Sequence, residues 1–192
     1  MKKNIFLAMV SCMILTLGFL QPVFAQQNAG PASVILNHYA ARDFAAGAIP
    51  RSDLELIVQA GVRAPSARNI QPWHFTVVQN QNLAKQFVSN IVDGNVLIVV
   101  SAPGDGKTNG VQILDSALAV QSIYLAAQAL GYGSRIYTGP MDTINTRFKT
   151  ELGFPSGYSA VALVRVGKVQ GKVDAVSAAS ARKKAEEVVT YR

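Results

Sequence analysis

The chain has 192 residues and a formal net charge of +7, with 18 Lys and Arg against 11 Asp and Glu. The basic residues are scattered and no nucleic-acid motif accompanies them, so the charge favours anionic ligands without indicating nucleic-acid binding. Cys12 is the only cysteine, so a chain processed after it would have no disulfide, zinc–thiolate site or cysteine nucleophile.

The first 25 residues have the pattern of a secretory signal peptide. Two lysines open the segment, an apolar core follows over 5–20, and Val23-Phe24-Ala25 offers small residues for cleavage. We therefore expect export by the Sec route to the periplasm or beyond, with 26–32 as a flexible lead-in and 33–192 as one domain. An uncleaved membrane anchor is the alternative, because the apolar stretch is long enough to span a bilayer.

The rest of the chain predicts alternating helices and strands, which indicates a layered α/β or α+β domain. Apolar residues spaced by three and four indicate helices, and short apolar runs between turn residues indicate strands. A capping-box pattern, Ser52-Asp-Leu-Glu55, predicts where the second helix begins. In chain order we expect helix 34–39, helix 52–62, strand 73–78, helix 81–91, strand 95–101, helix 114–130, a short strand, helix 141–152, strand 160–166 and helix 178–189.

The helix expected over 114–130 is the most apolar of these. Asp115, Gln121, Ser122 and Gln128 interrupt it, which favours a buried helix over a membrane span. Two places suit such a helix, a domain core or a subunit interface.

Residues 64–75 read Ala-Pro-Ser-Ala-Arg-Asn-Ile-Gln-Pro-Trp-His-Phe and carry the clearest functional signal. They connect a helix to a strand, where binding residues are often placed on a rigid scaffold. The carboxamides of Asn69 and Gln71 each carry donors and an acceptor in one plane. That chemistry suits a planar ring whose edge alternates N–H and C=O groups, such as a flavin. Trp73 and Phe75 are most simply core residues.

Other motifs have simpler structural explanations. Gly104-x-Gly106-Lys107-Thr108 has the wrong spacing for a phosphate-binding loop, and Gly131-Tyr-Gly133 suits a helix end. The two histidines, His38 and His74, have no carboxylate pair at ligand spacing, so we expect no metal site. The Gly-x-Ser-x-Gly motif of a nucleophilic serine is absent from the sequence.

The run 64–75 resembles the signature of the nitroreductase family of flavin oxidoreductases. The resemblance extends over about 33–190. It includes a long central helix (112–133), a Leu-Gly-Phe-Pro turn with the following strand (152–155 and 161–167), and a C-terminal segment with Arg182 and Glu186-Glu-Val-Val189.

The resemblance implies an α+β fold, an α/β/α sandwich around a mixed, mainly antiparallel sheet. It also implies a homodimer with FMN at the subunit interface, and NAD(P)H as the usual reductant. NAD(P)H is expected to be scarce outside the cytoplasm, which leaves the reductant of an exported protein open. No catalytic side chain is expected, because the flavin carries the chemistry.

The resemblance also assigns the cofactor-binding residues. Pro65, Ser66 and Asn69 would line the flavin, Gln71 would support their loop, and Thr138 and Gly139 would lie against the reactive flavin nitrogen. The cations are Arg42 beside the ring edge or phosphate, Arg63 facing a ligand, and Arg182 reaching the phosphate. For the three arginines, the alternative is an ordinary solvated surface position.

One segment departs from the family pattern, because His38-Tyr39-Ala40 stands where Arg-Arg-Ser is usual. Charge-assisted hydrogen bonds to a phosphate are lost by that change. The leading interpretation is an exported FMN-dependent oxidoreductase that passes hydride or electrons to a nitro, quinone or similar acceptor. Two alternatives are a non-catalytic binding protein that has lost tight FMN binding, and a flavin-dependent dehydrogenase that runs in the opposite direction.

Overall fold

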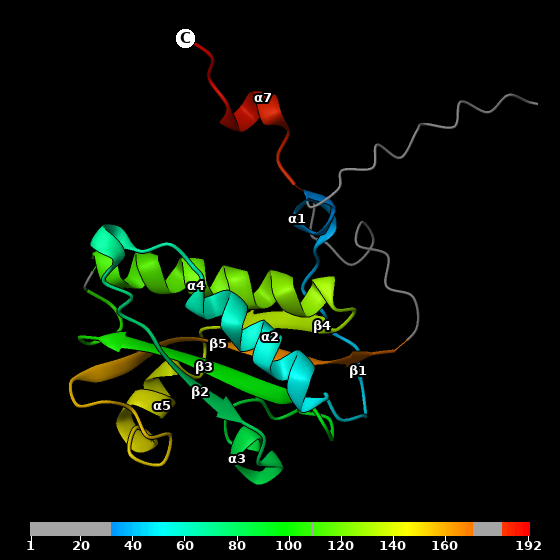
Figure 1. The fold of residues 1–192 in the computed structure, drawn as a ribbon, viewed down its shortest axis with the longest axis vertical. Helices are drawn as coiled ribbons and strands as arrows, with labels where there is room; N and C mark the ends of the chain where they lie inside the picture. The colour runs from blue at the N-terminus through cyan, green and yellow to red at the C-terminus, as the bar shows by residue number, and fades with distance from the viewer. Residues whose placement is uncertain (1–31, 109, 171–181) are drawn as a thin grey trace, which may run out of the picture. The chain divides into compact units, whose positions relative to one another are not determined.

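The computed structural model describes residues 32–108, 110–170 and 182–192, and Val34 to Arg192 belong to one compact unit. The expected signal peptide and the lead-in up to residue 31 lie outside the described residues. Figure 1 shows the elements in chain order. They are α1 (Ser33–Asn37), β1 (Phe44–Ala45), α2 (Arg51–Val62), the 3₁₀ turn η2 (Ala67–Asn69), β2 (His74–Val78), α3 (Gln81–Lys85), β3 (Val96–Pro103), α4 (Gly110–Ala129), β4 (Gly133–Tyr137), α5 (Met141–Arg147), β5 (Tyr158–Val169) and α7 (Ala185–Val188).

The five strands form one sheet, and every pairing among the described strands is antiparallel. The strand order is β1-β5-β3-β2, and β4 also pairs with β5. β5 is long enough to pair with β4 through Leu163–Gly167 and then with β1 through Lys168–Val169. The expected α+β class is confirmed.

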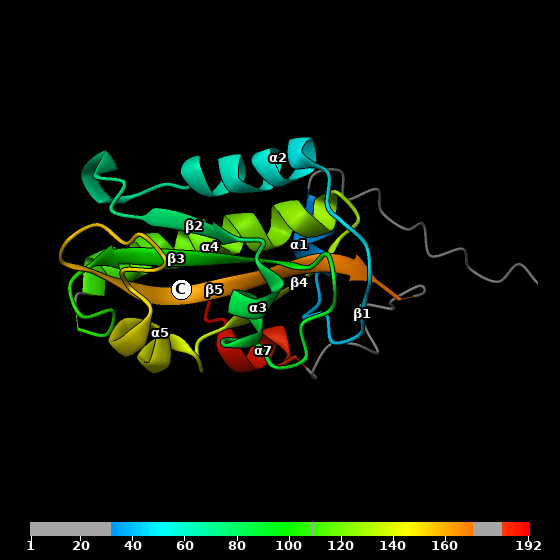
Figure 2. The same ribbon diagram turned by 90° about the horizontal axis from the view of Figure 1, so that it is seen from below.

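Helices cover both faces of the sheet, as the unbroken apolar run of β3 requires. Figures 1 and 2 show α2 and α4 on one side and α3 and α5 on the other. Val96, Ile98 and Val100 pack into the core on the α2–α4 side, whereas Leu97 and Val99 pack on the α3–α5 side. This alternation is the period of two expected of a strand.

The central helix α4 packs against α2 and against β3, β4 and β5. It is the one helix of the described chain long and apolar enough to cross a membrane, judged by length and composition only. Gly61 is buried where α2 meets it, and an added Cβ there would lie 2.7 Å from Ile123 Cδ1. The missing side chain therefore lets the two helices approach closely just before α2 ends.

The capping box expected at Ser52–Glu55 is wrong. Pro50 precedes α2 without any side-chain cap, and Ser52 already lies inside the helix. Proline's fixed φ suits the start of a helix, here −54°. Glu55 instead accepts a hydrogen bond from Arg51 Nε at 2.6 Å.

Other helix ends also differ from expectation. The helix expected over 81–91 ends at Lys85, and the one expected over 141–152 ends at Arg147. In both cases the apolar residues that follow pack into the second core as irregular chain, including Phe87, Val88 and Leu152. Of the helix expected over 178–189, the first four residues lie outside the described chain, and the described part is helical only at Ala185–Val188.

Candidate functional site

The loop between α2 and β2 has an unusual backbone. Arg68, Asn69 and Gln71 have φ values of 53°, 56° and 52°, in the left-handed region that side chains other than asparagine rarely adopt. For Arg68 and Gln71 this conformation costs about 1–2 kcal/mol each. Strain of this kind persists only where the surroundings enforce it, and it is concentrated at functional sites.

Polar contacts within the loop enforce this conformation. The backbone N–H of Gln71 donates to Ser66 Oγ at 3.0 Å, and the N–H of Asn69 donates to the Ser66 carbonyl at 3.0 Å. The Gln71 side chain donates through Nε2 to Asn69 Oδ1 at 3.1 Å. Ser66 is therefore the hub of the loop, and the two carboxamides are held side by side.

A side chain of α4 fixes the same loop from below. The N–H of Ala67 donates to Asp115 Oδ1 at 3.0 Å, and Asp115 is only 4% exposed. In the sequence, Asp115 stands out only as an interruption of an apolar helix. An acidic residue in such a helix is itself a signal, because a buried carboxyl group needs a polar partner.

The loop presents its remaining polar atoms outward. Pro65, Asn69 and Gln71 are exposed. Within the described residues, neither Asn69 Nδ2 nor Gln71 Oε1 makes a hydrogen bond to the protein. One donor group and one acceptor are therefore free to meet a ligand with the opposite pattern, as expected for a ring edge that alternates N–H and C=O.

The segment 38–42 is held differently, by its own backbone. Tyr39 donates its N–H to Gln128 Oε1 at 3.1 Å and accepts from Gln128 Nε2 at 2.9 Å, while the N–H of Ala41 donates to the Ser134 carbonyl at 3.0 Å. Gln128 thus pairs with a peptide group on both sides, as a neighbouring strand would. Arg42 follows, and it is exposed.

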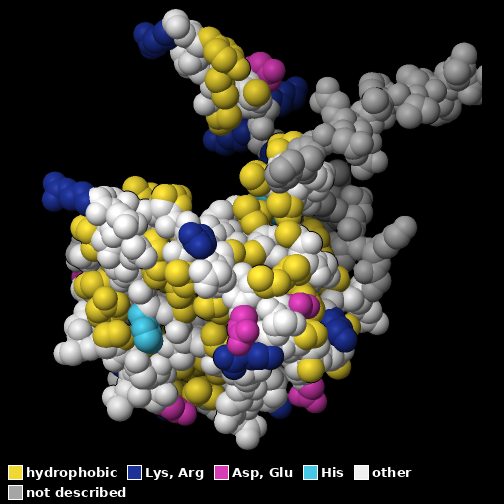
Figure 3. Space-filling model, viewed as in Figure 1, with side chains coloured by type: hydrophobic (Ala, Val, Ile, Leu, Met, Phe, Trp, Pro, Cys, Tyr) yellow, Lys and Arg dark blue, Asp and Glu magenta, His cyan; other side chains and the backbone are white. Residues whose placement is uncertain are grey.

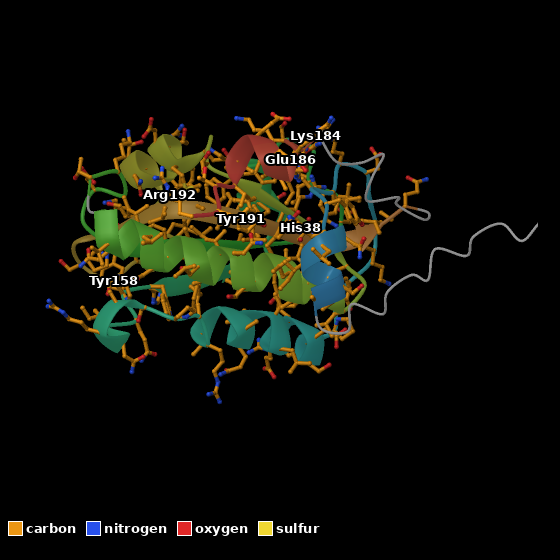
Figure 4. All side chains as sticks on the ribbon, turned by 90° about the horizontal axis from the view of Figure 1, so that it is seen from above. His38, Tyr158, Lys184, Glu186, Tyr191 and Arg192 are labelled. Carbon is orange, nitrogen blue, oxygen red and sulfur yellow. The ribbon has the colours of Figure 1, made fainter. Side chains whose placement is uncertain are left out.

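The side chains of His38 and Tyr39 are engaged near the end of α4. The ring of His38 lies edge-on to Tyr124 at 5.6 Å between centroids, and Figure 4 shows His38 above that half of the helix. Burial, and then the nearby Tyr124, raise the pKa of Tyr39. Burial also raises the pKa of Tyr124, against opposing effects of a hydrogen bond with Gln128 and the charge of Arg182. Both phenols therefore stay neutral near pH 7.

Thr138 and Gly139 are exposed between β4 and α5. Gly139 also lines a hollow of about 400 Å³ on the α3–α5 side, together with Asn90, Tyr137 and residues around them. Asn90, which lines this hollow, and Asn95 accept hydrogen bonds from the buried guanidinium of Arg165 at 2.8–3.1 Å. Burial lowers the pKa of Arg165, and a hydrogen bond with Tyr137 counteracts part of that effect.

The structure gathers the expected site residues only in part. Arg63, which follows α2 directly, joins Pro65, Ser66, Asn69 and Gln71 in the single connection 63–72. Within the described residues no hydrogen bond or ion pair joins that connection to Arg42 or to Thr138–Gly139. Arg182 lies near Tyr124, whose pKa its charge influences. In the described chain, no hydrogen bond or ion pair therefore links the connection 63–72 with the other expected site residues.

Comparison with known proteins gives one consistent result. A family model described as the Nitroreductase family matches residues 35–93 and 87–168. The "Putative NADH dehydrogenase/NAD(P)H nitroreductase" of Archaeoglobus fulgidus is 31% identical over 136 residues, which is 66% of this chain and 78% of that protein.

Solved structures share the fold at lower identity. A nitroreductase with bound FMN from Desulfitobacterium hafniense has a TM-score of 0.67 at 24% identity, covering 83% of this chain and 96% of its own. An FMN-dependent nitroreductase from Clostridium difficile has a TM-score of 0.68 at 22% identity, covering 86% of this chain and 100% of its own.

Proposed function

The chain belongs to the nitroreductase family, and from that premise we propose that it is an exported FMN-dependent oxidoreductase that reduces a nitro, quinone or similar electrophilic acceptor. The observation that carries the proposal is the connection 63–72. Its strained backbone presents Asn69 and Gln71 to solvent with one donor group and one acceptor left for a ligand. Backbone strain of this kind is concentrated at active sites and ligand-binding sites.

The residues present fit a flavin ring better than they fit its phosphate. Asn69 and Gln71 match the polar ring edge, and the exposed peptide at Thr138–Gly139 would lie against the ring. By the family resemblance, Arg42 and Arg182 are the cations that would meet the phosphate. FMN, when bound, supplies the transfer of hydride or single electrons, and the protein chain binds, orients and shields the reacting groups.

An apolar stripe on α4 supports formation of the site from two copies of the chain. Val111, Leu114 and Leu118 are 55%, 61% and 39% exposed and follow one face of α4 at spacings of three and four. Figure 3 shows hydrophobic side chains reaching the surface over α2 and α4. We propose that a second copy covers this stripe. Light scattering should report a dimer, and Leu114→Glu should shift it to monomer, whereas a wild-type monomer would refute the dimer.

The place of action and the reductant complete the proposal. Residues 1–25 would direct the chain out of the cytoplasm, which the mass of the protein from fractionated cells tests directly: cleavage after Ala25 leaves 26–192. The A. fulgidus relative's name includes NAD(P)H, and we take NADH and NADPH as the first reductants to assay. An unprocessed protein in the cytoplasm would overturn the proposed export. It would leave the proposed FMN-dependent activity unaffected.

A second candidate function is a non-catalytic binding protein on the same scaffold. It is favoured by the segment 38–40, where His38 and Tyr39 pack near Tyr124 and Ala40 offers no side-chain donor. The two functions separate in one assay. The enzyme retains or takes up FMN and oxidises NAD(P)H when a quinone is added, whereas the binding protein does neither.

A further inference from the structure

The central helix carries a buried acid directly beneath the loop assigned to flavin. Asp115 lies in the second turn of α4, 48 positions away from its partner Ala67, and is 4% exposed. The residue beside it, Ser116, is also fully buried, but its hydroxyl has no hydrogen-bond partner in the described part of the chain. Of these two neighbouring polar residues, only Asp115 reaches the loop.

The hydrogen bond from Ala67 to Asp115 lies at the start of the loop's 3₁₀ turn. Ala67 begins the 3₁₀ turn that contains Arg68 and Asn69, the first two residues with positive φ. Its N–H lies at the start of the turn, where helical backbone leaves donors without internal partners. Ser66, one residue earlier, accepts the hydrogen bond that holds Gln71. A bond at Ala67 therefore restrains the strained turn and the serine hub together.

We infer that Asp115 is a positioning residue for the flavin site, whose carboxyl group holds the 64–72 loop in the conformation that presents Asn69 and Gln71. The consequence for FMN rests on the proposed function, whereas the effect on the loop does not. The hydrogen bond from the Ala67 N–H to the Asp115 side chain stabilises the turn that begins at Ala67. Its loss lets the loop relax into unstrained conformations that must be reversed before a ligand binds.

The test compares four variants by two measurements, hydrogen exchange of the flavin-free protein and titration with FMN. Asp115→Ala removes the acceptor, and Asp115→Ser keeps a polar group that is too short to reach Ala67. Asp115→Asn retains an acceptor oxygen at the same reach. Ser116→Ala is the matched control, because it removes a buried hydroxyl that makes no hydrogen bond to the loop.

We expect amides 66–71 of Asp115→Ala and Asp115→Ser to exchange about tenfold faster or more, while the amides of β3 keep wild-type rates. The dissociation constant for FMN should rise about tenfold to a hundredfold. Asp115→Asn should restore both quantities to within about threefold of wild type, and Ser116→Ala should match wild type.

Unchanged loop exchange in both Asp115→Ala and Asp115→Ser would overturn the inference, and so would the same acceleration in Ser116→Ala. Faster exchange spread evenly over β3 and the loop would also overturn it, because that pattern reports general destabilisation. If the wild-type protein does not bind FMN, the proposed function fails, and the exchange rates still decide whether Asp115 holds the loop.

Discussion

The 64–72 loop and the 38–42 segment are each held by a polar side chain of α4. They differ in how many polar side chains they leave exposed to a ligand. Asp115 holds the first through Ala67, and Gln128 holds the second through Tyr39. The loop keeps its carboxamides exposed, whereas His38 and Tyr39 are turned to contacts near Tyr124. The helix therefore positions both backbones, but within 38–42 only Arg42 keeps an exposed polar side chain for a ligand.

The largest expected effect comes from removing a loop carboxamide. Asn69→Ala deletes a ligand-facing group, the acceptor for Gln71 Nε2, and the residue type that best tolerates positive φ. We expect the dissociation constant for FMN to rise about tenfold to a hundredfold, measured by flavin fluorescence. Asn82→Ala, at an exposed asparagine of α3, is the control and should bind as wild type does. Equal affinity of Asn69→Ala and wild type would place the ring elsewhere.

A smaller effect on binding is expected when the ligand lacks the phosphate group of FMN. Because the 38–42 segment lacks the usual side-chain donors, riboflavin should bind within about tenfold of FMN, since the phosphate contacts are left to exposed cations. Parallel titrations at two salt concentrations measure this. A preference for FMN of a thousandfold or more would contradict the comparison and would mean that Arg42 and Arg182 grip the phosphate fully.

The features behind these two predictions were not equally predictable from the sequence. Asn69, Gln71 and the flanking prolines were sufficient to predict a ring-binding loop, because the chemistry is carried by residue types. The positive φ values of Arg68 and Gln71 were not predictable, since neither residue type favours that conformation. The hydrogen bond between the loop and Asp115 of α4 was not predictable either. A buried acid in the sequence does not indicate which distant backbone N–H donates to it.

In the fold, too, some elements were predictable from the sequence and others were not. The buried strands were predicted because apolar runs between turn residues have few alternatives. The ends of α3 and α5 were missed because Phe87, Val88 and Leu152 keep a helical spacing while packing as irregular chain. The two-residue strand β1 pairs only with the end of β5, and so short an element carries no periodic signal.

The third prediction concerns the support of the 38–42 segment. Gln128→Ala removes the acceptor for the Tyr39 N–H and the donor to its carbonyl, and also a bond to Ser134 Oγ. We expect the free energy of unfolding to fall by about 1–3 kcal/mol, with FMN affinity reduced only a few-fold. Urea denaturation measures the first, with the exposed Gln121→Ala on the same helix as control. A loss of FMN as large as that of Asn69→Ala would make the two regions equal partners.

The smallest expected effect is on stability at high pH. The Tyr132 hydroxyl donates to Asp53 Oδ2 at 2.6 Å, tying α2, which leads into the loop, to the chain that follows α4. This bond raises the pKa of Tyr132 to about 12, above its ordinary value of about 10. The folded state favours the protonated phenol, so the stabilisation is complete below pH 10 and is lost as pH rises to 12. Tyr132→Phe should lack this loss between pH 10 and 12; an identical decline in both proteins would contradict the assignment.

The central claim is that the strained loop makes this chain a flavin protein, and titration of the purified, flavin-free protein with FMN tests it most directly. We expect saturable binding of one FMN per chain, seen as a change in flavin fluorescence and a visible absorbance that stays with the protein on gel filtration. A colourless protein that leaves the fluorescence of added FMN unchanged at every concentration would contradict it.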